Sequence, residues 1–225
     1  RLGVIVSGHV SQDPAAQAEE LCAMAETGAE ALVLVVNRLA GQEEPDEIWM
    51  ENAARLLRAL PDIPLGLYEC PYPYKRLMTP QTLRFCADSG RFYFLKDTCC
   101  DAETIAARLE LLAGSPLKLF NANSATLLDT LRHGAAGFCG VMGNFHADLY
   151  AWLCANTDDA RADALMALLS HLSNMESFGY PLNAKYHATL EGLALQVITR
   201  QRCAPLTEIQ RLQTRQMLPL EEMAR

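Results

Sequence analysis

Short apolar runs alternate with helical segments along residues 1–156 of this 225-residue chain. Six such runs have the character of buried strands, at 2–7, 31–36, 63–68, 92–96, 117–120 and 137–142. A segment with one apolar helical face follows each strand, and Asp13, Thr79 and Asp101 stand where a helix N-cap is expected. Strict alternation of this kind is typical of a parallel sheet covered by helices, so the sequence predicts an α/β fold.

A barrel fits this alternation better than an open nucleotide-binding sheet, because no GxGxxG or Walker loop follows any strand. The six β-α units take up about 26 residues each, whereas a closed barrel has eight strands and typically about 250 residues. We therefore expect a TIM (β/α)8 barrel with six units visible and two missing before Arg1. An open or permuted variant of the barrel is the alternative.

The alternation stops after residue 156. Three successive helices are expected there, at 158–175, 183–200 and 206–217, with a break at Gly179 and Pro181. The predicted domains are thus a barrel portion over 1–156, holding strands three to eight, and a helical extension over 157–225.

Composition excludes several classes of partner. The net charge of -8 and the absence of a Lys/Arg cluster argue against nucleic-acid binding. No apolar run reaches the roughly 18 residues that a membrane span needs, and no signal peptide is visible. The eight cysteines form no CxxC and no zinc spacing with histidine, which predicts buried thiols of a reduced, cytoplasmic protein.

The strand ends show no sign of a metal site. They carry no HxH motif and no cluster of carboxylates, so we expect no catalytic metal. The histidines share no spacing that would suggest a common ligand set, and we interpret them as structural or surface residues. They are His9, His133, His146, His171 and His187.

Lys96 ends the fourth apolar run, and residue alternation predicts that it shares a face with Phe92 and Phe94. A lysine on an apolar face loses hydration, which lowers its pKa and makes its amine a nucleophile able to form a Schiff base. A lysine that marks a strand end and extends its amine into solvent is the alternative.

Tyr68 ends the strand that precedes the Lys96 strand. Neighbouring parallel strands lie about 4.8 Å apart, so two inward-facing side chains at their ends can come within hydrogen-bonding reach. A phenol beside an amine can relay protons while a carbinolamine forms and breaks. A core tyrosine whose hydroxyl bonds to the backbone is the alternative for Tyr68.

Four segments resemble conserved motifs of the dihydrodipicolinate synthase and N-acetylneuraminate lyase family. The run from Pro64 to Pro71 (PLGLYECP) resembles the family's YNxP strand and loop, and Phe94 to Thr98 (FLKDT) resembles its GIKD(S/T) strand. Residues 134–144 (GAAGFCGVMGN) resemble its strand eight, GGxGxISxxxN. Residues 182–185 (LNAK) lie near its Pro-x-Lys segment, and together the motifs span nearly the whole chain.

The resemblance implies a TIM barrel with a three-helix C-terminal extension, assembled as a homo-oligomer, either dimer or tetramer. It also implies a class I aldolase-type lyase that acts on a 2-keto acid and an aldehyde, without metal or organic cofactor. Lys96 would form the covalent imine and Tyr68 would relay protons. Cys139 would line the floor of the site as a substrate contact, and Asn121 is a second substrate-binding candidate.

The sequence departs from the synthase branch of the family at two places. Asn37 and Arg38 stand where that branch has a tyrosine, and Pro73 stands where it has an arginine. The family's Thr-Thr or Ser-Thr pair that binds the substrate carboxylate would lie before Arg1. These departures disfavour dihydrodipicolinate synthesis itself. They leave open another keto-acid lyase, a catalytically impaired or regulatory member that binds a keto acid without turnover, and a truncated fragment.

Overall fold

The computed structural model describes residues 3–200 and 203–225. Its contacts divide the chain into two compact units. The first unit comprises residues 1–121 and 133–136, and the second comprises residues 122–132 and 137–225. None of the helices in the described ranges is long and apolar enough to cross a membrane.

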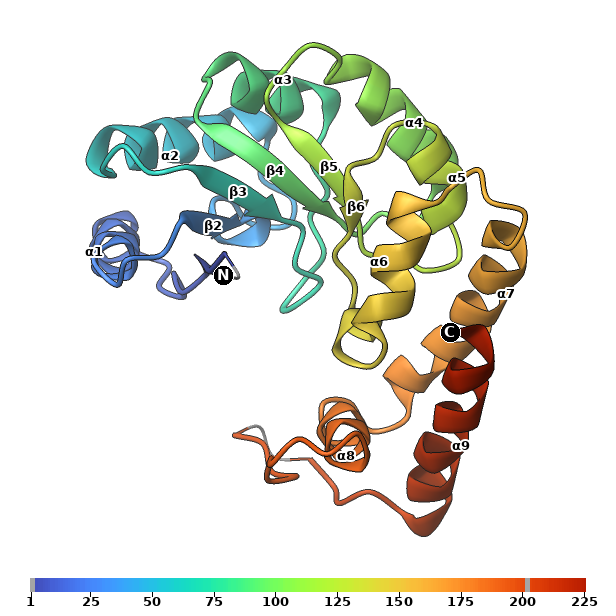
Figure 1. Ribbon diagram of the computed structural model, residues 1–225. Coiled ribbons are helices and arrows are strands. Elements are labelled where there is room, and N and C mark those ends of the chain that lie inside the picture. Colours follow the sequence, from blue (N-terminus) through green and yellow to red (C-terminus); the bar gives the residue numbers. More distant parts are fainter. Residues whose placement is uncertain (1–2, 201–202) are drawn as a thin grey trace. The chain divides into compact units, whose positions relative to one another are not determined.

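The first unit alternates strands and helices in chain order (Figure 1). Its strands are β1 (Ile5–Val6), β2 (Ala31–Val35), β3 (Leu65–Tyr68), β4 (Phe92–Asp97) and β5 (Lys118–Asn121). Its helices are α1 (Pro14–Ala25), η1 (Val36–Arg38), α2 (Asp46–Ala59), α3 (Pro80–Asp88) and α4 (Ala102–Leu111). Each expected strand of this unit is therefore present, and the predicted N-caps Asp13, Thr79 and Asp101 all accept a backbone N–H of their helix.

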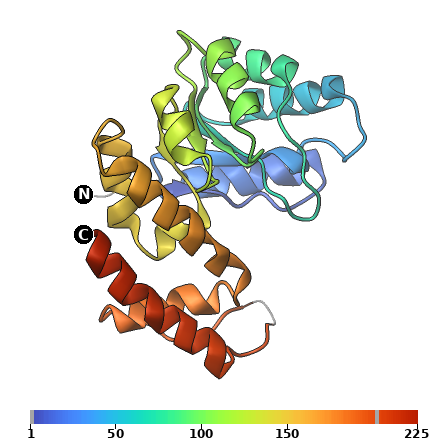
Figure 2. The same cartoon turned by 90° about the vertical axis from the view of Figure 1, so that its right-hand side faces the viewer.

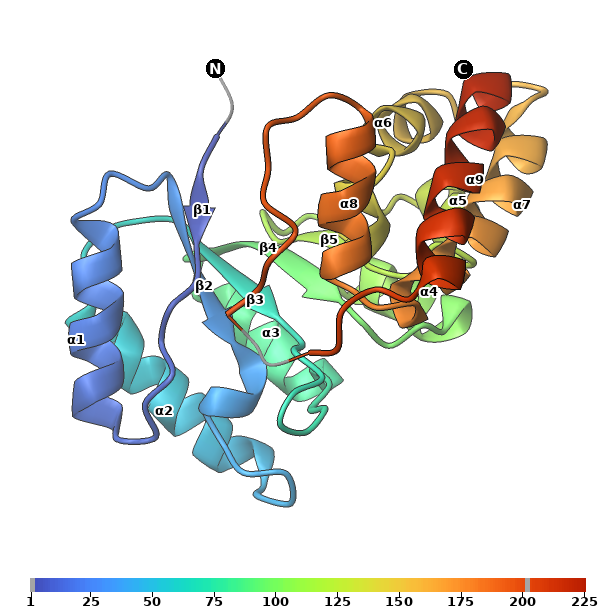
Figure 3. The same cartoon turned by 90° about the horizontal axis from the view of Figure 1, so that it is seen from below.

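The five strands of this unit pair in parallel, each with the strand next to it in the chain (Figure 3). Parallel strands joined in chain order through helices are the arrangement found in a (β/α) barrel. The carboxyl ends of all five strands therefore lie at one edge, where the active site of such a barrel is located.

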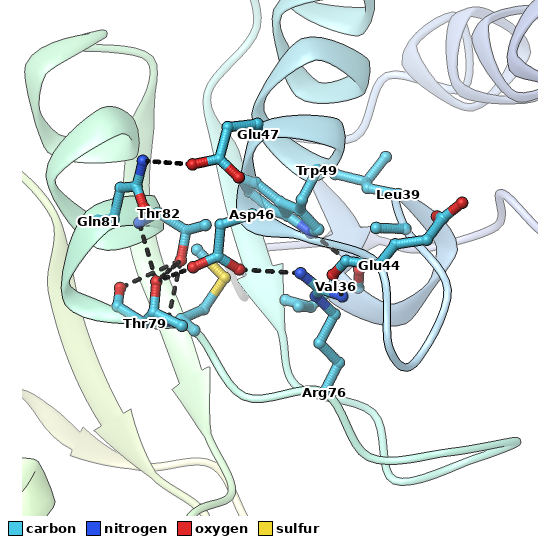
Figure 4. Close-up of polar contacts among 12 residues, drawn as sticks. Val36, Leu39, Glu44, Asp46, Glu47, Trp49, Arg76, Thr79, Gln81 and Thr82 are labelled. Atoms are coloured by element: carbon cyan, nitrogen blue, oxygen red, sulfur yellow. Dashed lines mark hydrogen bonds and ion pairs between the residues drawn. The ribbon is translucent and has the colours of Figure 1, made fainter.

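The core of the first unit lies between the sheet and its helices. Leucines of the strands pack there against apolar side chains of α1 to α4. Trp49 of α2 is fully buried in this core, and its indole N–H donates to the carbonyl of Val36 at 2.9 Å (Figure 4). The bond satisfies the polar atom of the largest buried side chain and ties α2 to the end of β2.

The second unit is mainly helical. Its elements are α5 (Leu127–Arg132), β6 (Gly137–Phe138), η2 (Val141–Asn144), α6 (Ala147–Ala155), α7 (Ala162–Leu172), η3 (Ser173–Ser177), α8 (Leu182–Leu190) and α9 (Glu208–Ala224). Apolar side chains of α5, α6 and α7 form one core cluster, to which Met217 of α9 also belongs. Helix α9 lies alongside α7 and α8 (Figure 2).

Helices α5 and α6 belong to the same compact unit as the C-terminal helices, and the predicted division between residues 156 and 157 stays a prediction. Helices α5 and α6 bury Leu128 and Leu153 in the same cluster as Leu169 of α7. These helices therefore fold with the C-terminal helices rather than with the first five strands.

Two predicted elements extend too far. The helix expected over 183–200 ends at Leu190, because Gly192 adopts a φ of +93° that leaves the helical path. The strand expected over 137–142 ends at Phe138, and a 3-10 turn begins at Val141. Strand ends and helix ends depend on tertiary contacts that apolar periodicity does not encode.

Candidate active site

Tyr68 and Lys96 lie side by side at the carboxyl ends of β3 and β4. They are register partners in the parallel ladder. The Lys96 Nζ lies over the Tyr68 ring, 4.4 Å from its centroid. Both side chains are half-buried. The predicted pair is thus adjacent, and the amine of Lys96 contacts the face of the Tyr68 ring.

A bulge in β4 changes which residues share the face of Lys96. Leu65 pairs with Phe92, whereas Gly66 pairs with Phe94, so Tyr93 is the extra residue. Phe92 consequently lies in the core under the helices and is fully buried. The expectation that Phe92 shares a face with Lys96 was wrong, because one inserted residue reverses the alternation of faces.

Phe94 and Gly66 form a matched pair just below Tyr68 and Lys96. A Cβ atom on Gly66 would lie 2.0 Å from Cε2 of the Phe94 ring. The ring therefore occupies the space that a side chain at residue 66 would take. This packing places an aromatic group two residue pairs below the candidate site, on the same face of the sheet.

A buried ion cluster fixes the residues that follow Tyr68 and Lys96. Glu69 and Asp97 are both fully buried, and Arg108 of α4 is 6% exposed. Arg108 Nη2 lies 2.9 Å from Glu69 Oε1, and Arg108 Nη1 donates to Asp97 Oδ2. One guanidinium thus joins the ends of both site strands to the helix behind them.

Glu69 also organises the loops at the strand ends. Its Oε1 accepts the N–H of Met78 at 2.7 Å, and its Oε2 accepts the N–H of Thr98 at 2.9 Å. Burial raises the pKa of Glu69, although attraction to Arg108 opposes this rise. Burial alone lowers the pKa of Arg108, but the two carboxylates outweigh it and raise the pKa overall. The charges of the cluster therefore depend on one another.

Asn37 holds the proline-rich loop that follows β3. Its Nδ2 donates to the carbonyls of Cys70, Tyr72 and Tyr74 at 2.8, 3.0 and 2.6 Å. Tyr74 in turn donates its hydroxyl to the carbonyl of Asn37 at 2.7 Å. The position where a family tyrosine was expected is therefore occupied by a residue that shapes the loop beside Tyr68.

Arg76 anchors the next part of the same loop (Figure 4). It donates to Asp46 Oδ1 at 2.8 Å and to the carbonyl of Gly41 at 2.6 Å. The other oxygen of Asp46 accepts the hydroxyl of Thr79, the N-cap of α3, at 2.5 Å. The loop from β3 to α3 is thus fixed at both ends, which gives Tyr68 a defined surrounding.

His9 lies beyond β1 at the same edge of the sheet. Its Nε2 accepts the N–H of Val35 at 2.6 Å, and the side chain is 1% exposed. Burial lowers the pKa of His9 to about 4. His9 is therefore a neutral residue that joins the segment after β1 to the end of β2, in agreement with the structural role expected for it.

The two predicted substrate contacts lie in different places. Asn121 pairs in register with Asp97 and is fully buried, so its side chain is on the sheet face opposite Lys96, and Phe120 is the register partner of Lys96. Cys139 belongs to the second unit and is a half-buried free thiol. Their proposed roles as substrate contacts stay predictions.

Sequence reasoning missed the supporting residues around the pair. Glu69 and Asp97 directly follow Tyr68 and Lys96 in the sequence, but nothing in their spacing connects them to Arg108. Asn37 was noted only for not being a tyrosine. In the described part of the chain, the one group of side chains with metal-ligand geometry lies outside this site, in the C-terminal helices.

Comparison with known proteins identifies the family. Residues 5–220 match the sequence profile of the dihydrodipicolinate synthetase family. The chain belongs to this family. No curated protein sequence matches it. Membership supports an enzyme and, in general terms, a pyruvate-type aldolase or lyase.

Solved structures of this family share the fold. The prophage protein YagE of E. coli K12, described in complex with pyruvate, is 18% identical with a TM-score of 0.85, covering 99% of this chain and 76% of its own. The chloride-inhibited dihydrodipicolinate synthase of Acinetobacter baumannii, also with pyruvate, is 21% identical with a TM-score of 0.81 and coverages of 99% and 76%. The Thermotoga maritima dihydrodipicolinate synthase is 18% identical with a TM-score of 0.83 and coverages of 98% and 76%.

Proposed function

We propose that this chain is a class I aldolase-type lyase that forms a Schiff base between Lys96 and a 2-keto acid. The observation that carries this proposal is the pairing of Lys96 with Tyr68 at the carboxyl ends of neighbouring strands, with Nζ 4.4 Å from the ring centroid. Family membership supports the same reaction class.

In the proposed reaction, the neutral amine of Lys96 attacks the keto carbon and forms a carbinolamine. Loss of water, with a proton supplied to the leaving hydroxyl, gives the imine. Tyr68 is proposed to relay this proton. The protonated imine then accepts the electron pair released when the neighbouring C–C bond breaks, or stabilises the nucleophile when that bond forms. Hydrolysis of the imine releases the product and restores the amine.

Borohydride trapping tests this proposal. Reduction in the presence of pyruvate should attach one reduced adduct to the peptide that contains Lys96, detected by mass spectrometry. The matched control is Lys118, an exposed lysine of the adjacent strand β5. We expect K118R to retain the adduct and K96R to lose it. A folded protein without an adduct at Lys96 would refute the proposal.

The Tyr68→Phe variant separates imine formation from proton relay. It keeps the ring that contacts Lys96 and removes only the hydroxyl. We expect Y68F to form the reduced adduct more slowly, by about 10²- to 10⁴-fold if the hydroxyl relays the rate-limiting proton. Trapping at the wild-type rate would exclude Tyr68 from that role. Adduct formation without turnover of any aldehyde would indicate a binding or regulatory member.

The oligomeric state is a further part of the proposal. The resemblance implies a dimer or tetramer, although one similar structure is described as a monomeric dihydrodipicolinate synthase variant. Sedimentation velocity over a range of concentrations tests this point, and a monomer at all concentrations would contradict it.

A further inference from the structure

Lys96 lies in the middle of a row of three register partners. Tyr68 of β3 pairs with Lys96 of β4, which pairs in turn with Phe120 of β5. The residues before Lys96 and Phe120, Leu95 and Leu119, belong to the core between the sheet and its helices. Lys96 and Phe120 therefore share the opposite face of the sheet. Because neighbouring strands lie about 4.8 Å apart, Lys96 lies between two aromatic side chains.

Two rings fill the space on the β3 side of the Lys96 amine. The centroid of the Tyr68 ring lies 4.4 Å from Lys96 Nζ. The Phe94 ring lies in the space that a Cβ atom on Gly66 would take, two residues before Tyr68 in β3. A carbon chain bound to Nζ therefore has room in two directions. One is towards Phe120 on β5, and the other is towards the carboxyl ends of the strands.

The two groups attached to the keto carbon of a 2-keto acid suit different directions. One is the carboxylate, and the other is the carbon that is a methyl group in pyruvate, here called the alkyl carbon. The face of an aromatic ring repels negative charge, so the carboxylate suits the carboxyl ends of the strands. The alkyl carbon then lies towards Phe120. The Phe120 side chain is half-buried, and its ring can neither donate nor accept a hydrogen bond.

We propose that Phe120 is a specificity-determining residue that selects 2-keto acids with hydrogen or an alkyl group on the alkyl carbon over those with a hydroxyl group there. This inference rests on the imine proposed at Lys96. A hydroxyl group beside Phe120 would lose hydration without gaining a hydrogen-bond partner, whereas a methyl group would gain apolar contact. An apolar site can disfavour an added hydroxyl group by up to about 100-fold.

Two keto acids of nearly equal size test this selection. On the alkyl carbon, 2-oxobutanoate carries a methyl group and hydroxypyruvate carries a hydroxyl group. Each is added at low concentration to the full chain with sodium cyanoborohydride, which adds hydride to the imine carbon and leaves a secondary amine on Lys96. Mass spectrometry of the peptide that contains Lys96 gives the initial rate. The measured quantity is the rate with 2-oxobutanoate divided by the rate with hydroxypyruvate.

A matched pair of variants changes only the polarity at residue 120. Phe120→Thr and Phe120→Val create side chains of nearly equal shape, and both are favoured in strands. Any loss of packing is therefore common to both. We expect the rate ratio to be at least about tenfold lower in F120T than in F120V, because only threonine offers the hydroxyl group a partner. Tyr93→Thr, at a 47% exposed position of β4, is the control and should keep the wild-type ratio.

Wild type supplies a second measurement that needs no variant. The same two acids react with the amine of free Nα-acetyl-lysine, which gives their intrinsic rate ratio. We expect the ratio at Lys96 to exceed this intrinsic ratio by at least about tenfold. Equal ratios at Lys96 and at the free amine would overturn the role of Phe120.

The outcomes separate this inference from the proposed function. If the adduct forms at Lys96 and F120T and F120V give the same rate ratio, Phe120 does not select the substrate, but the imine at Lys96 stands. If folded wild type gives no adduct at Lys96 with either acid, both proposals are overturned.

Discussion

Replacing Arg108 with methionine should destabilise the first unit more than replacing any surface arginine. Arg108 is 6% exposed and is the cation in contact with both Glu69 and Asp97, which are fully buried. Methionine fills a similar volume but supplies no charge. Two buried carboxylates would then be left without their positive partner.

The expected loss follows from that geometry. Breaking a buried ion pair by removing one partner costs about 3–5 kcal/mol. Because Arg108 serves two carboxylates and also donates to the carbonyl of Met78 at 2.7 Å, we expect a loss near the upper end, about 5 kcal/mol. Burial already raises the pKa of Glu69 against the opposing attraction of Arg108. In R108M, protonation of Glu69 would relieve the repulsion between the two buried carboxylates. The loss of stability relative to wild type should therefore shrink as the pH falls towards 5.

Urea unfolding followed by tryptophan fluorescence measures this effect. Trp49 lies in the core of the first unit. Replacing the other tryptophan, Trp152, with phenylalanine makes the fluorescence signal specific to the first unit. Arg84→Met, at an exposed position of α3, is the matched control and should change the free energy of unfolding by less than about 0.5 kcal/mol. A loss below about 1 kcal/mol in R108M, or a loss unchanged between pH 7 and pH 5, would refute the reasoning.

Three further predictions concern the same unit. Burial lowers the pKa of His9 from 6.5 to about 4, so His9 takes up a proton in the unfolded chain before it does so in the folded chain as the pH falls. This difference should lower the stability of wild type by about 2 kcal/mol between pH 7 and 5. His9→Gln should remove this contribution to the pH dependence. Gly66→Ala should cost about 1–3 kcal/mol, because its Cβ would meet the Phe94 ring at 2.0 Å, and a smaller residue at position 94 should restore part of the loss in a double-mutant cycle. Asn37→Ala removes three hydrogen bonds to the loop 70–74, so limited proteolysis should cut that loop faster than in wild type, and equal cutting rates would contradict this role.

Apolar periodicity was enough to predict how the site pair comes together. Tyr68 and Lys96 each end a buried run, and the two runs follow one another in the chain. Parallel strands joined by a helix lie next to each other in the sheet, so residues at their carboxyl ends become neighbours. The adjacency of the pair therefore depends on local patterns and short connections, which a sequence displays directly.

Only the tertiary structure decided which face of the sheet a side chain lies on and which residues are its register neighbours. The extra residue Tyr93 in β4 moves Phe92 to the other face, and the alternation of residue types gives no sign of it. Register likewise places Asn121 beside Asp97 and away from Lys96. A shift of one residue reverses every side chain beyond it, and hydrogen bonds between strands determine that shift.

Long-range polar contacts were also invisible in the sequence. Glu221 meets His146 and His187 across 75 and 34 residues, so no motif with fixed spacing could reveal the cluster. The separations reflect how α6, α8 and α9 pack. The alternating pattern of the sequence thus determined the fold class and the Tyr68–Lys96 pair. The packing of elements distant in the chain decided which buried charges share a partner, because burial makes each charge depend on whichever group lies beside it.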